Sequence, residues 1–403
     1  MHRSFKRAAL LSAIGLLAGC AGNSTSLPAA GGNIATQSIA QFPAANVFKS
    51  CATVLPGDDA RCYAQVRTDV RGIGPNSTPS GFGPSSLQSA YALPSSTNGA
   101  GQTVGIVDAY DDPNAESDLG VYRAQYGLPP CTTANGCFTK YTQRGRQHGF
   151  PAENLGWAQE SALDLDMASA MCPNCKIILV EANTNSFGNL AKAEDTAAAK
   201  GAHVISNSYG GGESGSQPYE KSYNHAGVAI TASTGDAGYG AQFPATSPHV
   251  TAVGGTDLFK DAGVPRGWRE TAWIDGGSGC SVFYAKPTWQ TDTGCTMRME
   301  ADVAADADPG TGVAVYGPTS TTASGWQVYG GTSVAAPMVG GIYANNGGSV
   351  NYGSNPYANT GALNDITTGG NGKCPGEPAY YCHAEVGYDG PTGLGTPIGN
   401  TAF

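Results

Sequence analysis

Apolar residues fall into two patterns along the chain from residue 101 to the C-terminus. Short, nearly continuous apolar runs are typical of buried strands, whereas apolar residues three and four positions apart are typical of helices. The two patterns alternate, which predicts a mainly parallel sheet covered by helices on both faces, and therefore an α/β fold. The expected strands are residues 103–108, 176–181, 203–206, 228–232, 250–254 and 326–329, and the expected helices are residues 85–91, 118–126, 157–171, 189–200 and 334–344.

Polar residues follow several of these predicted strands. Asp108 ends the first strand, Ser206-Asn207-Ser208 ends the third, and Ser233-Thr234-Gly235-Asp236 follows the fourth. Sites in parallel sheets lie at the carboxyl ends of the strands, so we expect these segments to gather at one edge. A Gly-rich turn presents Asp236 there, where its carboxyl group could bind a metal, cap the turn or, if protonated, donate a hydrogen bond to an oxyanion.

Two acids interrupt an apolar stripe on the predicted helix 157–171. Glu160 and Asp164 are four residues apart and therefore lie on one face. The same face carries Trp157, Met167 and Met171. If this face is buried, desolvation and mutual repulsion raise the pKa of both acids, so the pair could share a proton and provide a general base in acid solution. The alternative is an ordinary solvated acidic face. Asp166 lies nearly opposite Asp164, and we expect it to face solvent.

A serine follows two glycines in residues 330–337, Gly-Gly-Thr-Ser-Val-Ala-Ala-Pro. Ser333 would stand at the N-terminus of the helix 334–344, where free N–H groups and the helix dipole favour negative charge. The glycines would let another chain approach closely. Ser333 could attack a carbonyl group if a neighbouring base takes its proton and a donor holds the oxyanion. Alternatively, Ser333 only caps the helix.

The composition indicates an exported, loop-rich globular protein. Of the 403 residues, 40% are hydrophobic, only 13% are charged and 58 are glycine. Lys and Arg total 21 while Asp and Glu total 31. This acidic balance argues against nucleic acid or an anionic membrane as the main partner.

The first twenty residues are typical of a bacterial lipoprotein signal. A basic start precedes an apolar run that is too short to span a bilayer, and Leu17-Ala18-Gly19-Cys20 resembles a lipobox. Cys20 would then carry the lipid that provides the only membrane contact. An ordinary secretory signal is the alternative, and both predict an extracytoplasmic bacterial protein that is secreted or membrane-anchored. We expect a tether with a small disulfide-closed loop over residues 21–80 and the folded domain over residues 81–403.

Eleven cysteines occur, so ten remain besides Cys20, and export favours disulfides among them. They form pairs of close neighbours along the chain. One of these pairs would close a loop that leaves the predicted sheet at residues 131–141. The pattern predicts five local bridges, which join Cys51 to Cys62, Cys131 to Cys137, Cys172 to Cys175, Cys280 to Cys295, and Cys374 to Cys382. The Cys172-Pro173-Asn174-Cys175 segment could instead be a redox pair, although no thioredoxin-like pattern surrounds it.

Several motifs together resemble the sedolisins, the serine-carboxyl peptidases that are acid-acting relatives of the subtilisins. The resemblance runs from about residue 81 to the C-terminus. It is carried by Gly331-Thr332-Ser333 with Pro337, by Glu160 with Asp164, by Ser206-Asn207-Ser208-Tyr209-Gly210, and by residues 233–238, 243–245, 253–256, 302–316 and 388–395. It implies a subtilisin-like three-layer α/β fold and an acid endopeptidase with protein or peptide substrates. We expect a monomer.

The resemblance also implies roles for four residues. Ser333 would attack the scissile carbonyl group, and Glu160 would take its proton and pass it to the leaving amine. Asp164 would orient Glu160 and share its proton. Asp236, in its protonated form, would join the backbone N–H of Ser333 in holding the oxyanion. A carboxylate base works several pH units below an imidazole, and a donating Asp236 must keep its proton, so both demands predict an activity maximum at acid pH.

Sedolisins bind calcium near the C-terminus, and the resemblance implies one structural Ca²⁺ in this chain. Asp365 and Asp389 would supply carboxylates, whereas Ile366, Glu385 and Gly387 would supply backbone carbonyl oxygens. Oxygen-only ligands from loops suit calcium. Glu385 departs from the usual glycine of the family, which a carbonyl ligand tolerates. Two unrelated Asp-containing turns are the alternative.

Two other functions remain open from the sequence. A conventional subtilisin-like triad would need a histidine, and His148 with Asp108 offers the one candidate, although Phe150-Pro151 does not continue that motif. A catalytically inactive, calcium-stabilised surface binding module on the same scaffold is also possible. Sedolisins usually carry a prodomain of well over a hundred residues, whereas about 60 residues separate Cys20 from the resembling region. Either a separate partner assists folding or this member folds without one.

Overall fold

The computed structural model describes residues 46–51, 59–70, 74–347 and 353–403. These residues belong to one compact unit that spans Phe42–Phe403. The predicted signal peptide, with Cys20, and the first part of the predicted tether lie outside the described residues. Within the described ranges, no helix has the length and apolar character needed to cross a bilayer.

An eight-stranded sheet forms the centre of this unit, in the order β11-β10-β9-β7-β4-β6-β5, with β14 pairing to β10 off this path. Every pairing is parallel except that of β11 with β10, which confirms the predicted mainly parallel sheet. The strands are β4 (Thr103–Ala109), β5 (Phe138–Thr142), β6 (Lys176–Ala182), β7 (Val204–Asn207), β9 (Ala229–Ser233), β10 (Thr251–Lys260), β11 (Trp268–Ala272) and β14 (Val303–Asp306). Strand β5 lies where the sequence predicts only a disulfide-closed excursion.

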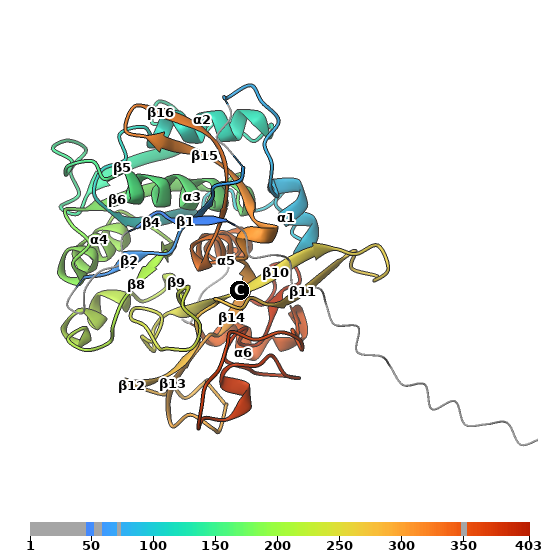
Figure 1. Ribbon diagram of the computed structural model, residues 1–403. Helices are drawn as coiled ribbons and strands as arrows, with labels where there is room; N and C mark the ends of the chain where they lie inside the picture. Colours follow the sequence, from blue (N-terminus) through green and yellow to red (C-terminus); the bar gives the residue numbers. More distant parts are fainter. Residues whose placement is uncertain (1–45, 52–58, 71–73, 348–352) are drawn as a thin grey trace, which may run out of the picture. The chain divides into compact units, whose positions relative to one another are not determined.

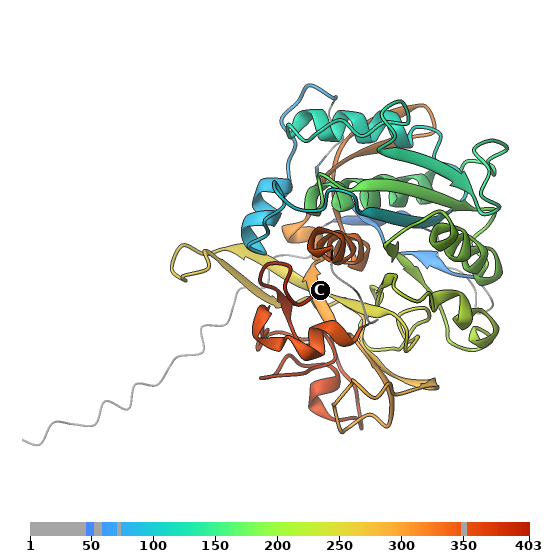
Figure 2. The same ribbon diagram turned by 180° about the vertical axis from the view of Figure 1, so that it is seen from behind.

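Successive side chains of the central strands point into two different apolar cores, because side chains alternate between the faces of a sheet. On β6, Leu179 enters the core that includes residues of α3 and α5, whereas the next residue, Val180, enters the core that includes residues of α4. Helices therefore cover both faces, which confirms the predicted three layers (Figure 1, Figure 2). The helices are α1 (Pro84–Ala90), α2 (Ala115–Gln125), α3 (Leu155–Met171), α4 (Phe187–Ala199), α5 (Thr332–Asn346) and α6 (Ser354–Ala358).

Helix α3 is buried on every side from Trp157 to Met171. It packs against α5, the central sheet and β15 (Val313–Ser320). The expectation that Asp166 faces solvent is therefore wrong: this side chain is fully buried, and its Oδ2 accepts a 2.9 Å hydrogen bond from the backbone N–H of Tyr316. The polar and apolar pattern of α3 alone could not reveal that a second sheet covers its far side.

This second sheet has four strands in the order β1-β3-β16-β15, and all of its pairings are antiparallel. Strand β16 (Ala323–Gly330) contains the predicted strand 326–329. Strands β1 (Val47–Lys49) and β3 (Gln65–Arg67) come from the segment in which the sequence predicts a tether. A further short strand of that segment, β2 (Arg61–Cys62), pairs with β8 (Tyr209–Gly210). The described residues of this segment, 47–51 and 59–67, are thus integrated into the fold.

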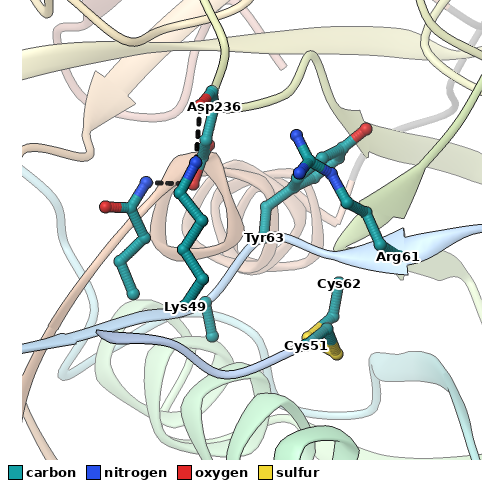
Figure 3. A pocket seen from close by; sticks show the side chains of 8 residues that line it. Lys49, Cys51, Arg61, Cys62, Tyr63 and Asp236 are labelled. Atoms are coloured by element: carbon teal, nitrogen blue, oxygen red, sulfur yellow. Dashed lines mark hydrogen bonds between the residues drawn. A yellow bond between two sulfur atoms is a disulfide. The ribbon is translucent and has the colours of Figure 1, made fainter. Parts of the chain in front are cut away.

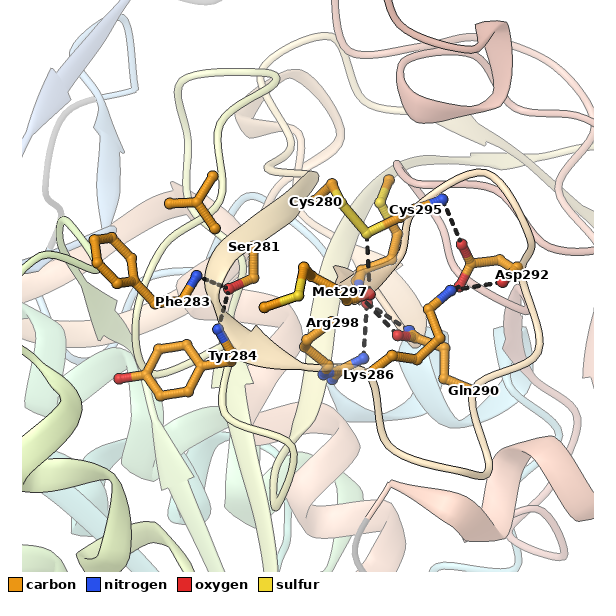
Figure 4. Close-up of a disulfide and its surroundings, with 12 residues drawn as sticks. Cys280, Ser281, Phe283, Tyr284, Lys286, Gln290, Asp292, Cys295, Met297 and Arg298 are labelled. Carbon is orange, nitrogen blue, oxygen red and sulfur yellow. Dashed lines mark hydrogen bonds and ion pairs between the residues drawn. A yellow bond between two sulfur atoms is a disulfide. The ribbon is translucent and has the colours of Figure 1, made fainter.

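All five predicted disulfides are confirmed. Cys172 and Cys175 are both buried, which favours a structural role over the redox alternative. The bridge from Cys280 to Cys295 fastens the loop between β12 (Gly279–Ala285) and β13 (Met297–Glu300) (Figure 4). The remaining short elements are β17 (Leu363–Asn364), β18 (Thr396–Pro397) and the 3-10 turns Gln217–Tyr223, Pro309–Thr311, Thr360–Ala362 and Ala379–Tyr381.

Candidate active site

Ser333 is the second residue of α5, immediately after a sharp turn at Gly331. The turn needs glycine because φ at Gly331 is +98°, a left-handed value that residues with a side chain rarely adopt. The predicted position of Ser333 at a helix N-terminus is therefore confirmed. Pro337 has no N–H to donate to the carbonyl group of Ser333 four residues earlier. The hydroxyl oxygen of Ser208 lies 3.4 Å from that carbonyl oxygen.

Glu160 and Asp164 project from one side of α3, and both are fully buried. The Ser333 hydroxyl lies close enough to Glu160 to lower the pKa of that carboxyl group, although here it donates to the backbone oxygen of Ser208 at 3.2 Å. Oε1 of Glu160 and Oδ2 of Asp164 receive no N–H or O–H donor within the described part of the chain. Two buried and unpaired acceptor oxygens on neighbouring acids are well placed to hold one proton between them.

Burial is the largest cause of a strong upward shift in the pKa of Glu160 and of Asp164. The next cause for both is the nearby charge of Asp108, the last residue but one of β4, which is itself fully buried. Burial also raises the pKa of Asp108 to about 7. Three close, buried carboxyl groups do not ionise together, so their protons leave in steps that belong to the cluster rather than to single residues.

Asp236 follows β9 and is only 3% exposed. Its Oδ1 accepts hydrogen bonds from the backbone N–H and the hydroxyl group of Thr332, both at 2.8 Å. Its Oδ2 accepts a 2.8 Å hydrogen bond from Nε2 of Gln65. Burial raises the pKa of Asp236 to about 6, and these hydrogen bonds limit the rise. Asp236 therefore sits at the first turn of α5, one residue away from the backbone N–H of Ser333.

The expected gathering at the carboxyl ends of the strands is confirmed. Asp108 interacts electrostatically with the acids of α3. Ser208, just beyond β7, donates a 2.8 Å hydrogen bond to Oδ1 of Asp164. Asp236 reaches Thr332 at the start of α5. One edge of the central sheet thus brings the four predicted catalytic residues around the N-terminus of α5.

Sequence reasoning missed several residues that contact this cluster. Ser208 and Thr332 were recognised only as parts of motifs, and their hydrogen bonds depend on how distant elements pack. Tyr63 and Gln65 were assigned to a tether. The one local signal for them is the alternation of polar and apolar residues from Tyr63 to Arg67, which is weak over so short a stretch.

The alternative triad with His148 does not form in this structure. His148 is exposed in the loop after β5. Both carboxylate oxygens of Asp108 are buried without a donor among the described residues, so no imidazole N–H reaches them.

The predicted calcium ligands lie in two neighbouring loops near the C-terminus. Oδ2 of Asp365 accepts from the N–H of Gly387 at 2.9 Å, and Oδ2 of Asp389 accepts from the N–H of Glu385 at 3.1 Å. Burial, with a smaller contribution from the charge of Asp365, raises the pKa of Asp389 to about 8. No described residue donates a hydrogen bond to the carbonyl oxygens of Ile366, Glu385 or Gly387. Two adjacent carboxylates and three available carbonyl oxygens fit the donor set that calcium prefers.

Comparison with known proteins places this geometry in context. The model of the subtilase family matches residues 151–348. The chain is 31% identical to kumamolisin of Bacillus sp. (strain MN-32) over 80% of its own length and 63% of that protein. It is 27% identical to sedolisin of Pseudomonas sp. (strain 101) over 79% of its own length and 60% of that protein. The chain thus spans less than two thirds of the length of these relatives.

A solved structure gives the same picture. The chain is similar to Pseudomonas sedolisin, a serine-carboxyl proteinase complexed with two molecules of pseudo-iodotyrostatin, with a TM-score of 0.66 and 25% identity. The similarity covers 80% of this chain and 96% of that one. The similarity therefore extends over nearly the whole of that proteinase chain.

Proposed function

Because the chain belongs to the sedolisin family of subtilisin-like peptidases, we propose that it is a serine-carboxyl endopeptidase that hydrolyses proteins or peptides at acid pH. The observation that carries the proposal is the burial of Glu160 and Asp164 on α3 beside Ser333. A chain that used α3 only as a scaffold would have no reason to keep in its core two acids that each leave one carboxyl oxygen without a donor, because burying an unsatisfied polar group is costly.

The proposed reaction uses the acids of α3 as a proton relay. The pair formed by Glu160 and Asp164 carries one negative charge and one shared proton. Glu160 takes the hydroxyl proton of Ser333 while Oγ attacks the substrate carbonyl carbon. When the C–N bond breaks, Glu160 gives this proton to the leaving amine, which leaves an acyl-enzyme. Water then attacks the ester, Glu160 takes the water proton, and the proton returns to Oγ of Ser333 as the acid product leaves.

Asp236 is proposed to hold the oxyanion together with the backbone N–H of Ser333. A carboxyl group can donate to an oxyanion only while it is protonated. The pKa of Asp236 is raised to about 6, so this donor is present below that pH and is lost above it. The oxyanion donor therefore limits the alkaline side of the activity profile, and the shared charge of the acid pair limits the acid side.

A structural calcium ion is proposed at Asp365, Asp389 and the carbonyl oxygens of Ile366, Glu385 and Gly387. Its charge would offset the repulsion between the two carboxylates, which otherwise contributes to the raised pKa of Asp389. An extracytoplasmic location, secreted or anchored through a lipid on Cys20, is also proposed. Buried disulfides support export to an oxidising compartment.

Digestion of casein or haemoglobin at about pH 4 tests the proposal, with the Ser333→Ala variant as the control. We expect the wild-type chain to release peptides and the variant to release none. Peptide release by Ser333→Ala at the wild-type rate, or an activity maximum at or above pH 7, would contradict it. Failure of the wild-type chain to release peptides, even after any processing that it requires, would favour the alternative, an inactive calcium-stabilised binding module.

A further inference from the structure

A carboxyl group that the proposed reaction does not use is buried on the face of the central sheet opposite to the catalytic acids. Glu194 belongs to α4 and is fully buried, and neither of its carboxyl oxygens receives a hydrogen bond among the described residues. Burial raises the pKa of Glu194 well above its usual range, and the nearby amide group of Asn207 opposes this rise. Burying a carboxyl group that is so poorly satisfied is costly, so stability alone does not explain why it is there.

Asn207, the last residue of β7, is held by several elements at once. Its Nδ2 donates a 3.2 Å hydrogen bond to the backbone oxygen of Thr231 on β9, and its Oδ1 accepts a 2.6 Å hydrogen bond from the hydroxyl group of Tyr209. An amide Nδ2 carries two N–H groups, and only one of them has an acceptor among the described residues. The second N–H is therefore available to the carboxyl group of Glu194, which lies beside this amide.

The next residue along the chain, Ser208, belongs to the candidate active site. Successive side chains alternate between the two faces of a sheet, which is why Asn207 contacts α4 while Ser208 contacts α3. The hydroxyl group of Ser208 donates to Oδ1 of Asp164 at 2.8 Å, and its carbonyl oxygen accepts from Oγ of Ser333 at 3.2 Å. A single peptide unit thus joins the polar group buried against α4 to both the acid pair and the nucleophile.

Ser208 also borders the pocket that contains the proposed oxyanion donor. Its carbonyl oxygen accepts a 3.3 Å hydrogen bond from the backbone N–H of Tyr63. Tyr63 and Asp236 line one small pocket, with the bridge between Cys51 and Cys62 beside it (Figure 3). A misplacement of about 1 Å in an active site can lower the rate about 10²-fold, so catalysis requires a fixed position for Ser208.

We propose that Glu194 and Asn207 are a positioning pair that holds Ser208 in the place that catalysis requires. The pair touches neither the substrate nor the reacting atoms, and it acts through the hydroxyl and carbonyl groups of Ser208. The alternative is a pair that serves only the packing of α4 on the sheet. Replacing both members of a buried polar pair by apolar groups of similar shape is often neutral or stabilising, so a packing role predicts unchanged kinetics after such a replacement. This inference rests on the proposed peptidase function.

The test replaces both members of the pair in one chain. Glu194→Met and Asn207→Leu keep the approximate shapes of the side chains and remove both polar groups together, so neither member is left facing an unpaired partner. We call this form the apolar-pair variant. The hydroxyl group of Tyr209 loses its acceptor, but the hydroxyl group of Tyr223 remains 3.1 Å away as a partner.

We expect the apolar-pair variant to keep or exceed the Tm of the wild type, while kcat for a labelled peptide at acid pH falls about tenfold to a hundredfold with little change in KM. The acid limb of the pH profile should move toward neutrality, because a displaced Ser208 no longer donates to Asp164. The matched control is Thr251→Val with Tyr343→Phe, which removes a buried hydroxyl pair of 2.9 Å between β10 and α5 and should leave the kinetics unchanged. Wild-type kcat and an unshifted limb in the apolar-pair variant would overturn the inference.

Two further comparisons sharpen the result. In a chain that already carries Ser208→Ala the donor to Asp164 is absent, so the apolar pair should shift the acid limb no further, and an equal further shift would contradict the inference. Glu194→Gln keeps an oxygen that accepts from Asn207 and should retain wild-type kinetics, whereas Glu194→Met alone should lower kcat. Equal kcat in these two single variants would count against the pair, and this comparison remains available if the double replacement does not fold.

The free energy of unfolding separates failure of the inference from failure of the proposed function, because it is measured without catalysis. The wild type, Ser208→Ala, the apolar-pair variant and their combination form a double-mutant cycle in urea at about pH 4. Non-additive changes with no hydrolysis by any of these chains would support the link between the pair and Ser208 and refute the peptidase function. Hydrolysis by the wild type with additive changes would refute the inference and leave the peptidase function standing.

Discussion

The hydroxyl group of Ser208 donates a 2.8 Å hydrogen bond to Oδ1 of Asp164. It is the one hydrogen-bond donor to this carboxyl group among the described residues, because Oδ2 of Asp164 receives none. A donor favours the ionised form of an acid, so Ser208 opposes the rise in the pKa of Asp164 that burial causes. Through this bond the end of β7 helps to keep a negative charge available to the acid pair on α3.

The Ser208→Ala variant should therefore be less active at acid pH. Loss of the donor raises the pKa of Asp164, so the acid pair is neutralised at a higher pH and the acid limb of the profile moves toward neutrality. Loss of a hydrogen bond to a charged group corresponds to about tenfold in kcat/KM at about pH 4. The measurement is the pH dependence of kcat/KM for a labelled peptide. Ser208→Thr keeps a hydroxyl group and should retain the wild-type limb, whereas an unshifted limb in Ser208→Ala would refute this role.

Replacing Glu160 by glutamine should remove the general base while preserving the shape of the side chain. An amide cannot take the proton of Ser333, so we expect kcat to fall by about 10²–10⁴ with little change in KM. Steady-state kinetics with a labelled peptide measure both constants. The control is Glu116→Gln on α2, where the acid is half-buried and accepts a hydrogen bond from the hydroxyl group of Thr133. The proposed role fails if Glu160→Gln keeps kcat within a few-fold of the control.

The Asp236→Asn variant should change the alkaline limb of the pH profile. An amide donates a hydrogen bond at any pH, whereas the carboxyl group of Asp236, with its pKa raised to about 6, donates only below that pH. We expect Asp236→Asn to keep measurable activity and to lose the decline that begins near pH 6. Asp236→Ala, which has no donor at all, should lose about 10²–10³ in kcat. If the activity of Asp236→Asn still declined near pH 6, the group that titrates there would be a residue other than Asp236.

Local sequence patterns predicted the strands and helices whose side chains are mostly buried. Strand β6 is a run of seven residues of which six are buried, so its sequence alone shows an apolar stretch. The spacing of Glu160 and Asp164 likewise lies within one helix, and the helix was long enough to be recognised. The parallel sheet, the helices on both faces and the positions of these acids could therefore be inferred without coordinates.

The parts of the structure that the sequence did not predict depend on pairing between segments that are far apart in the chain. Strand β1 has three exposed residues and gains its conformation from pairing with β3, which itself pairs with β16 more than 250 positions later. The residue pattern of so short a strand gives no indication of which distant strand it pairs with. For the same reason, the contact of Ala64 with Glu160 and the burial of Asp166 beneath β15 depend on distant segments.

The protein should be more stable in acid than at neutral pH. Burial raises the pKa of Asp108, Asp112 and Asp257 to about 7, well above the ordinary value of 3.8. Above about pH 4 the unfolded chain releases these protons while the folded chain keeps them, so the free energy of unfolding falls as the pH rises toward 7. We expect Tm of the inactive Ser333→Ala variant, measured with a chelator present, to be lower by several degrees at pH 7.5 than at pH 4.5.

The Asp112→Asn change provides the matched test of this pH dependence. Asp112 lies outside the catalytic cluster, and its Oδ2 is buried without a donor. Asparagine is neutral at all pH values and resembles the protonated acid, so the difference in Tm between the two pH values should become smaller. A Tm that is equal or higher at pH 7.5 in the parent variant would show that these acids are not held neutral by the fold.

Calcium should raise the stability of the C-terminal loops. The expected site joins Asp365 and Asp389, and a ligand that binds only the folded chain at 100 times its Kd adds about 2.7 kcal/mol to the free energy of unfolding. We expect calcium to raise Tm of the Ser333→Ala variant and a chelator to reverse the rise. Since the pKa of Asp389 is raised to about 8, calcium must displace a proton, and its binding should weaken as the pH falls.

The Asp389→Asn variant should lose most of the calcium-dependent rise in Tm because it removes a carboxylate ligand. Glu377→Gln, which changes an exposed acid elsewhere in the same C-terminal region, should keep the full rise. Calorimetric titration with calcium at pH 8 and at pH 5 measures the same difference as an affinity. An unchanged Tm of the parent variant with calcium at both pH values would contradict the site. Asp365 and Asp389 would then belong to two unrelated turns, in which each carboxylate accepts only the backbone N–H hydrogen bond that the structure shows.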